Sequence, residues 1–148
     1  MFRGAAKVAL DDKGRMVMPT RFREQIVAEA QSKVVVTIDR DQCLLIYPQP
    51  EWERVEQKLM SLPMRPQARR LQRLMVGHAA ELELDGHFRF LVPPELREVA
   101  KLERQVMLVG QGNRIELWNE ARWTELRGQW LEAEATTDLQ TELDQFTL

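Results

Sequence analysis

Residues 10–24 read LDDKGRMVMPTRFRE, and residues 84–98 read LDGHFRFLVPPELRE. The two stretches align at a single offset of 74 residues. An aspartate, two arginines, a proline and a glutamate then recur at the same places. Chance can produce one such coincidence, but a series in a fixed order indicates internal duplication. We therefore expect the chain to contain two copies of one small unit.

The likeness continues beyond these stretches, with a shorter loop in the second copy. Residues 34–36, VVV, match residues 106–108, VML, and residues 44–47, LLIY, match residues 115–118, IELW. Each copy predicts four short strands, because apolar residues alternate or run together between polar turns. The expected strands are 7–10, 15–18, 33–38 and 43–47 in the first copy, and 81–84, 89–92, 105–110 and 114–118 in the second.

Helices are expected between and after these strands. A proline ends the second strand of each copy, since proline lacks the N–H that a strand ladder needs. A short helix should follow, over residues 21–29 with Thr20 as its cap, and over residues 95–100 with Pro94 in its first turn. Apolar residues at helical spacing predict three longer helices, at 51–62, 67–78 and 120–135. The acidic end, residues 136–148, is expected to fray.

Tryptophans recur at matching places in two of the longer helices, as Trp52 and Trp123. Exposed tryptophans can serve as platforms on which nucleobases stack. Here the spacing is that of a buried helix face. We therefore expect these side chains to pack against the core rather than to stack on bases.

The composition is that of a globular protein, with 44% hydrophobic and 30% charged residues. No apolar run approaches the roughly 20 residues that cross a bilayer, and the N-terminus lacks the apolar stretch of a signal peptide. We expect a cytoplasmic protein with no membrane partner. The net charge of −2 hides an asymmetry, because bases outnumber acids in residues 1–25, whereas residues 132–148 contain acids only. A phosphate-binding face would give this distribution, and so would charge scattered over the surface.

No grouping of residues indicates catalysis, a cofactor or a metal. His78 and His87 are the only histidines, and no second set of ligands accompanies them. Asp11 and Asp12 are adjacent, and neighbouring residues on a strand point to opposite faces, so we do not expect them to form a catalytic pair. The single cysteine, Cys43, lies in an apolar strand and is expected to fill the core rather than to react. We expect no enzyme activity, no cofactor and no metal site.

The hairpin motif Asp-x-x-x-Arg, followed by Met-Pro or Val-Pro and a short helix, resembles the AbrB-like swapped-hairpin fold. Two copies in one chain that begins MFRG and contains LDDKGR resemble the MraZ family, and the likeness extends from Met1 to Trp130. The resemblance implies an α+β fold. It also implies that two tandem AbrB-like half-domains exchange hairpins and form one pseudo-twofold β core with flanking helices, which agrees with the expectation that one half is too small to bury its β face alone. The expected divisions are 1–48 for the first half-domain, 49–78 for connecting helices, 79–120 for the second half-domain, and 121–148 for the C-terminal helix and acidic tail.

The resemblance also implies a function. Members of the MraZ family form rings and bind DNA upstream of the division and cell-wall gene cluster, regulating it together with their own expression. We therefore expect a sequence-specific transcriptional regulator at the nucleoid, whose partners are double-stranded DNA and further copies of itself. Head-to-tail subunits repeat one surface in one direction, so a ring suits short direct repeats about one helical turn apart.

The first hairpin turn carries the residues expected to touch DNA. Arg15 presents a planar fork that suits guanine or phosphate. Lys13 adds a charge that attracts phosphate, and Gly14 lets the backbone approach the duplex. Arg3 on the N-terminal arm is a further candidate contact. Arg15 could instead be held in an internal ion pair with Asp11.

The second turn is expected to organise itself rather than to read DNA. It has Phe88 where the family pattern has glycine, and it has no lysine. Asp85 and Arg89 are expected to hold this turn together, as Asp11 does in the first, with direct DNA contact by Arg89 as the alternative. A solvated helix face, with a second DNA contact as the alternative, is expected for Arg69, Arg70 and Arg73.

Two other functions fit the sequence. An AbrB-like antitoxin would use its acidic tail to block a toxin protein, although such antitoxins usually have one half-domain and a disordered tail. A ring-forming scaffold would touch DNA only incidentally. Co-purification with a toxic partner would favour the antitoxin, and equal affinity for random and upstream DNA would favour the scaffold.

Overall fold

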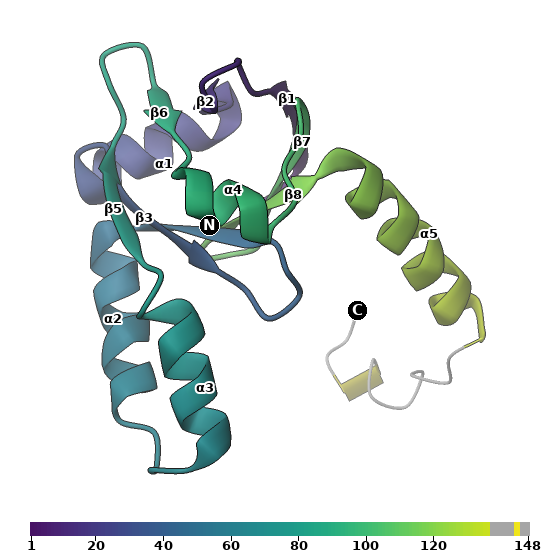
Figure 1. The fold of residues 1–148 in the computed structure, drawn as a ribbon. Coiled ribbons are helices and arrows are strands. Elements are labelled where there is room, and N and C mark those ends of the chain that lie inside the picture. Colours follow the sequence, from purple (N-terminus) through teal and green to yellow (C-terminus); the bar gives the residue numbers. More distant parts are fainter. Residues whose placement is uncertain (137–143, 146–148) are drawn as a thin grey trace.

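The computed structural model describes residues 1–136 and 144–145 (Figure 1). All the expected strands are present among them, with ends within two residues of the predictions. In chain order the elements are β1 (Ala5–Ala9), β2 (Arg15–Val17), α1 (Thr20–Ala30), β3 (Lys33–Ile38), β4 (Leu44–Pro48), α2 (Gln49–Met60), α3 (Pro66–Met75), β5 (Ala80–Glu83), β6 (Arg89–Leu91), α4 (Pro94–Val99), β7 (Gln105–Gly110), β8 (Ile115–Asn119) and α5 (Glu120–Thr136).

The strand pairing shows that the two copies are interlocked. Six strands form one antiparallel sheet in the order β1-β7-β8-β4-β3-β5. Strand β1 of the first copy pairs with β7 of the second, and β5 of the second copy pairs with β3 of the first. Strands β4 and β8 join the copies at the centre of the sheet. Each copy thus lends its first strand to the other, which confirms the exchanged hairpins and the α+β class.

Strands β2 and β6 form a separate two-stranded ribbon. Its register places Met16 opposite Phe90, and these are equivalent positions of the duplication. At the centre of the large sheet Leu45 faces Glu116, again an equivalent pair. A pseudo-twofold axis therefore passes through both the ribbon and the large sheet.

The large sheet is covered on both faces, which gives the molecule three layers (Figure 1). One face packs against the β2–β6 ribbon, α1 and α4 around the larger hydrophobic core. The other face packs against α2, α3 and α5 around a second core. Along β3, Val34 and Val36 belong to the first core and Val35 to the second, as the alternation of a strand requires. The ribbon and the layer of long helices therefore lie on opposite sides of the sheet.

Four helices, α1 to α4, start one or two residues before the predicted positions, and prolines explain the starts of α1 and α2. Helix α1 begins at Thr20, and Pro19 occupies the capping position without any side-chain hydrogen bond. The prediction that Thr20 caps this helix is therefore wrong. The fixed φ of Pro19, −55°, brings the chain to the helix start without a polar cap. Helix α2 begins at Gln49, two residues early, because Pro50 is tolerated in a first turn.

The tryptophans of the flanking helices pack against the core, as expected. Trp52 is 4% exposed. Trp123 is half-buried, and its ring centroid lies 5.8 Å from that of Trp118. Trp130 also contacts both of these rings, yet it stays 44% exposed. Figure 1 shows α2 and α3 side by side, whereas α5 projects from the body of the molecule.

Three further expectations concern single features. No helix in the described part of the chain has the length and apolar character that a membrane span needs. Cys43 is fully buried, as expected of a core residue. The prediction of a frayed acidic tail falls on residues that lie outside the described ranges, except for residues 136, 144 and 145.

Candidate nucleic-acid interface

One carboxylate organises the turn between β1 and β2. Asp11 accepts hydrogen bonds of 2.9 Å at Oδ1 from the backbone N–H groups of Lys13 and Arg15. Its Oδ2 accepts a bond of 2.8 Å from Nε of Arg15. The backbone and side-chain bonds from Arg15 lower the pKa of Asp11 to about 2. The carboxylate therefore stays charged throughout the physiological pH range.

The turn between β5 and β6 repeats this arrangement. Asp85 accepts bonds of 2.8 and 2.9 Å from the backbone N–H groups of His87 and Arg89, and one of 3.0 Å from Nε of Arg89. The backbone bond from Arg89 is the main cause that lowers the pKa of Asp85. The two turns therefore have the same hydrogen-bond pattern, because each aspartate holds its own arginine through Nε.

Both motif arginines keep part of the guanidinium available. The side chains of Arg15 and Arg89 are 49% and 51% exposed. Within the described residues, neither Nη1 nor Nη2 of these arginines donates a hydrogen bond. A guanidinium oriented in this way can offer parallel N–H donors to a pair of acceptors.

The outward face of the β2–β6 ribbon joins these arginines with apolar side chains. Arg15 lies opposite Leu91, and Val17 lies opposite Arg89. The residue between them on each strand is buried, whereas Val17 and Leu91 are 39% and 45% exposed. The arginines occupy one diagonal of the patch and the aliphatic side chains the other. We call these four residues the ribbon face: Arg15, Val17, Arg89 and Leu91.

The two turns differ at one position. Gly14 has a φ of +85°, and Phe88 in the equivalent place has a φ of +61°, both in the left-handed region that favours glycine. The guanidinium of Arg23 lies over the ring of Phe88, 4.7 Å from its centroid, and this cation–π contact offsets part of the backbone strain. In the first turn, the guanidinium of Arg97 packs directly on Gly14, where a Cβ would overlap it. An arginine from the other copy therefore covers each turn.

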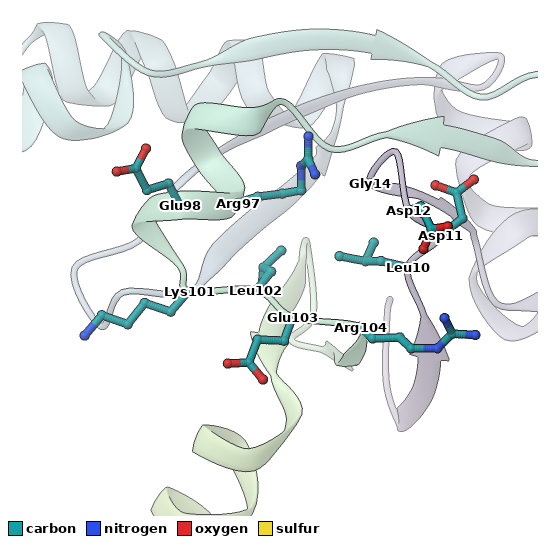
Figure 2. Close-up of a pocket in the computed structure, with 10 residues that line it drawn as sticks. All are labelled: Leu10, Asp11, Asp12, Gly14, Arg97, Glu98, Lys101, Leu102, Glu103 and Arg104. Atoms are coloured by element: carbon teal, nitrogen blue, oxygen red, sulfur yellow. The ribbon is translucent and has the colours of Figure 1, made fainter.

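This packing changes the part that Gly14 plays. The sequence predicted that its backbone approaches DNA, but Gly14 is buried, and the group that approaches it is the guanidinium of Arg97. Figure 2 shows Arg97 directed toward the turn, beside a hollow of about 620 Å³. Lys101 and Arg104 also line this hollow, together with four acidic residues. The hollow is therefore of mixed charge and carries no single preference for an anion.

The other candidate contacts lie in two places. Lys13 is exposed at the tip of the first turn, two residues before Arg15. Arg3 lies at the opposite end of β1, where Phe2 bridges to Gly112. The structure therefore brings Lys13 and Arg15 together and leaves Arg3 apart from them.

Sequence reasoning missed two arginines that shape the turns. Arg23 donates from Nε to the carbonyl of Met18 at 2.7 Å, and Arg97 donates to the carbonyl of Val92 at 3.0 Å. These bonds fix each side chain across the turn of the other copy. The repeat contained the signal, because each of the two stands eight residues after its motif arginine. Arg23 and Arg97 each contact the turn of the other copy, and their spacing in the sequence alone does not predict these contacts.

One cluster of potential metal ligands lies away from the hairpins, where the sequence predicted no metal site. Asp39, Cys43 and Glu116 bring ligand atoms within 4.8 Å of one another. Burial raises the pKa of the Cys43 thiol, which donates a hydrogen bond of 3.6 Å to Asp39. A thiol must lose its proton to bind a metal ion. These surroundings oppose that step, so the cluster carries no argument for a metal centre.

Comparison with known proteins gives the same family for both halves. The model of the family described as MraZ protein, antitoxin-like, matches residues 1–74 and again residues 75–146. A protein of Thioalkalivibrio sulfidiphilus named transcriptional regulator MraZ is 57% identical over 138 residues, which are 93% of this chain and 92% of that protein. Proteins of the same name from Halorhodospira halophila and Coxiella burnetii are each 51% identical. The first match covers 93% of this chain and 92% of that protein, and the second covers 100% of both.

Proposed function

This chain belongs to the MraZ family, and we propose that it regulates transcription by reading double-stranded DNA with its ribbon face. One observation carries the proposal. Two half-exposed arginines, each oriented by an aspartate, stand on the outer side of a two-stranded antiparallel ribbon. A ribbon of this kind fits the width of the major groove of B-DNA.

The ribbon face suits the chemistry of base edges in that groove. Arg15 and Arg89 can each donate two parallel hydrogen bonds to O6 and N7 of a guanine. Val17 and Leu91 offer apolar surface that suits the C5 methyl group of thymine. We therefore expect the bound sites to combine guanines and thymines at fixed spacing.

We propose that the first turn makes the stronger contact. Lys13 stands at its tip and can contact a phosphate, whereas the second turn has His87 in the equivalent place. Arg89 is as exposed as Arg15 and supplies the second contact. Arg3 is remote from the ribbon face and is not part of the proposed contact.

Self-assembly extends this contact along the DNA. We propose that copies associate head to tail into a ring and that each bound copy reads one of several short direct repeats. Linked contacts gain from a high effective concentration, which lets a chain of net charge −2 hold DNA tightly. The proposed target is the region upstream of the division and cell-wall gene cluster, including the chain's own promoter, and the proposed location is the nucleoid.

A gel shift with the protein's own upstream region against scrambled DNA tests the proposal. Arg15→Ala should weaken specific binding about 10- to 100-fold, because a bidentate guanine contact contributes about 1–3 kcal/mol. Its mass in solution should stay that of the unaltered protein. The matched control is Arg127→Ala, which removes an exposed arginine on α5, on the far side of the sheet. Full specific binding by Arg15→Ala would remove the ribbon from the mechanism.

The description of the family as antitoxin-like favours one second candidate, the binding of a toxin protein. Under that function the chain would co-purify with a small partner whose expression alone arrests growth. Specific binding of upstream DNA by the purified chain alone, with no such partner, would favour the regulator. Equal affinity for upstream and scrambled DNA would leave only a ring-forming scaffold.

A further inference from the structure

The α2–α3 hairpin ends in a groove of about 710 Å³ that is both apolar and basic. A second hollow adjoins it along α3, shares Arg70 and Leu74 with it, and adds Arg69 and Arg73. We call the two together the arginine groove. Its main lining joins three leucines and three arginines: Leu62, Leu71, Leu74, Arg40, Arg65 and Arg70.

The charged side chains that line the arginine groove are all positive. Residues 63–78 contain four arginines and no acid. No residue that lines either hollow is acidic. In the described part of the chain, neither these four arginines nor Arg40 forms an ion pair. Guanidinium groups around an apolar floor fit a ligand that is acidic and apolar at once.

The C-terminal segment of the chain has this complementary composition. Residues 128–148 contain five acidic residues and no basic one. Within them, Leu139, Leu143 and Phe146 recur at intervals of four and three residues, with acidic residues beside them. Side chains at these intervals share one face when a segment is helical. The segment can therefore offer apolar and acidic groups to the groove together.

The direction of α5 favours a second copy over the same chain as the binding partner of the segment. Figure 1 shows α5, whose last turns form the start of this segment, projecting away from α2 and α3. Near its end Trp130 and Leu131 are 44% and 66% exposed, so apolar surface remains uncovered there. We propose that the acidic C-terminal segment of one copy binds in the arginine groove of a second copy.

This contact would set the form of the assembly. The two surfaces that meet are different, so every copy offers one of each, and copies join head to tail. The inference rests on the self-association in the proposed function and assigns it a surface. The groove lies with α2 and α3 on the side of the sheet opposite the ribbon face, so assembly leaves the ribbon face accessible.

Charge reversal on each surface tests the contact by sedimentation velocity of the full chain without DNA. The groove variant is Arg65→Glu with Arg70→Glu, and the tail variant is Asp138→Lys with Glu142→Lys. Each should raise the concentration needed for assembly at least about tenfold, since attraction becomes repulsion. The four changes combined should restore assembly in large part. High salt should weaken assembly of the unaltered chain.

The matched control is Lys101→Glu with Arg104→Glu, two exposed cations in the hollow beside the first turn. It should keep the mass of the unaltered chain, and circular dichroism should show that every variant is folded. Three results would overturn the proposal: unchanged assembly in both variants, no recovery in the combined variant, or an unaltered chain that stays monomeric at every concentration. Since no DNA is present, failure of the ribbon proposal would leave these masses unchanged.

Discussion

At the scale of single residues, the ribbon face depends on two carboxylates whose charge is unfavourable for DNA. Asp11 and Asp85 lie beside the proposed contacts and would repel phosphates through charge alone. They also fix the turns and the guanidinium groups through hydrogen bonds. At these two residues, the hydrogen bonds that orient the arginines therefore favour DNA binding, whereas the negative charge opposes it.

Replacement of Asp11 by alanine tests whether the orienting hydrogen bonds or the negative charge has the larger effect on DNA binding. We expect Asp11→Ala to bind its DNA site about tenfold more weakly, because Arg15 loses its partner at Nε and a loosened guanidinium must be ordered on binding. Asp11→Asn keeps an oxygen for the turn amides and should lie in between. Fluorescence anisotropy measures the affinities.

The neighbouring acid provides the control for this prediction. The side chain of Asp12 accepts no hydrogen bond from any described residue, so Asp12→Ala changes mainly the charge. It should bind DNA equally or slightly more tightly. Tighter binding by Asp11→Ala as well would contradict the orienting role.

The covered turn gives a second prediction, for Gly14→Ala. The left-handed φ of Gly14 costs an alanine about 1–2 kcal/mol, and a Cβ there would overlap the Arg97 guanidinium. The free energy of unfolding, measured in urea, should therefore fall by at least this amount. Gly86→Ala in the other turn, where no atom lies within 4 Å of a new Cβ, should be nearly neutral. Equal losses in both variants would contradict both the cost of the left-handed φ and the overlap with Arg97.

Much of the structure of the two turns could be predicted from the sequence, and some of it could not. Repetition of Asp-x-x-x-Arg predicted that an aspartate orders each turn. The same reasoning treated Phe88 as a sign that the second turn organises itself rather than reads DNA. The structure gives both turns the same hydrogen bonds and one residue with a left-handed φ, and Arg23 lies over the aromatic ring of Phe88. Contacts between side chains of different copies leave no periodic pattern in a single sequence.

At the scale of elements, the strands were predictable and their pairing was not. Alternating apolar residues located every strand within two residues of its observed ends. Periodicity does not say which strands pair, and the exchange of β1 and β5 followed only from the resemblance to a known fold. The start of α1 was mispredicted because a proline in the capping position replaced the polar cap.

The ribbon gives a third prediction, in which the DNA is altered rather than the protein. Replacing thymine by uracil in the bound site removes only a methyl group. The affinity should fall about fourfold for each contacted thymine, since a buried methyl contributes about 0.8 kcal/mol. A variant with Val17→Ala and Leu91→Ala should be insensitive to the replacement. The same loss in variant and unaltered protein would place the thymine contact elsewhere.

At the scale of the whole molecule, the exchanged strands make each half depend on the other. The second copy supplies β5 to the edge of β3, and the first supplies β1 to the edge of β7. The sequence showed that there are two copies, yet it contained no local sign of how α2, α3 and α5 are placed. Those positions follow from packing against the second face of the sheet, which only the assembled fold defines.

This interdependence predicts the behaviour of separated halves. Residues 1–78 alone should show no cooperative unfolding transition, and the same holds for residues 79–148, because each half exposes unpaired strand edges and half of a core. Co-expressed halves should purify together and recover the circular dichroism of the intact chain. A cooperative transition in either isolated half would show that the exchange is dispensable.

The joining of two pseudo-symmetric halves in one polypeptide has a consequence for how the two turns can evolve. In a protein made of two identical subunits, every mutation alters both turns together. Here a change at Gly14 leaves Phe88 as it was, so natural selection can tune the two sides separately. Under the proposed function, a ribbon with unlike sides recognises a DNA site in one orientation only, so that each target site has a direction.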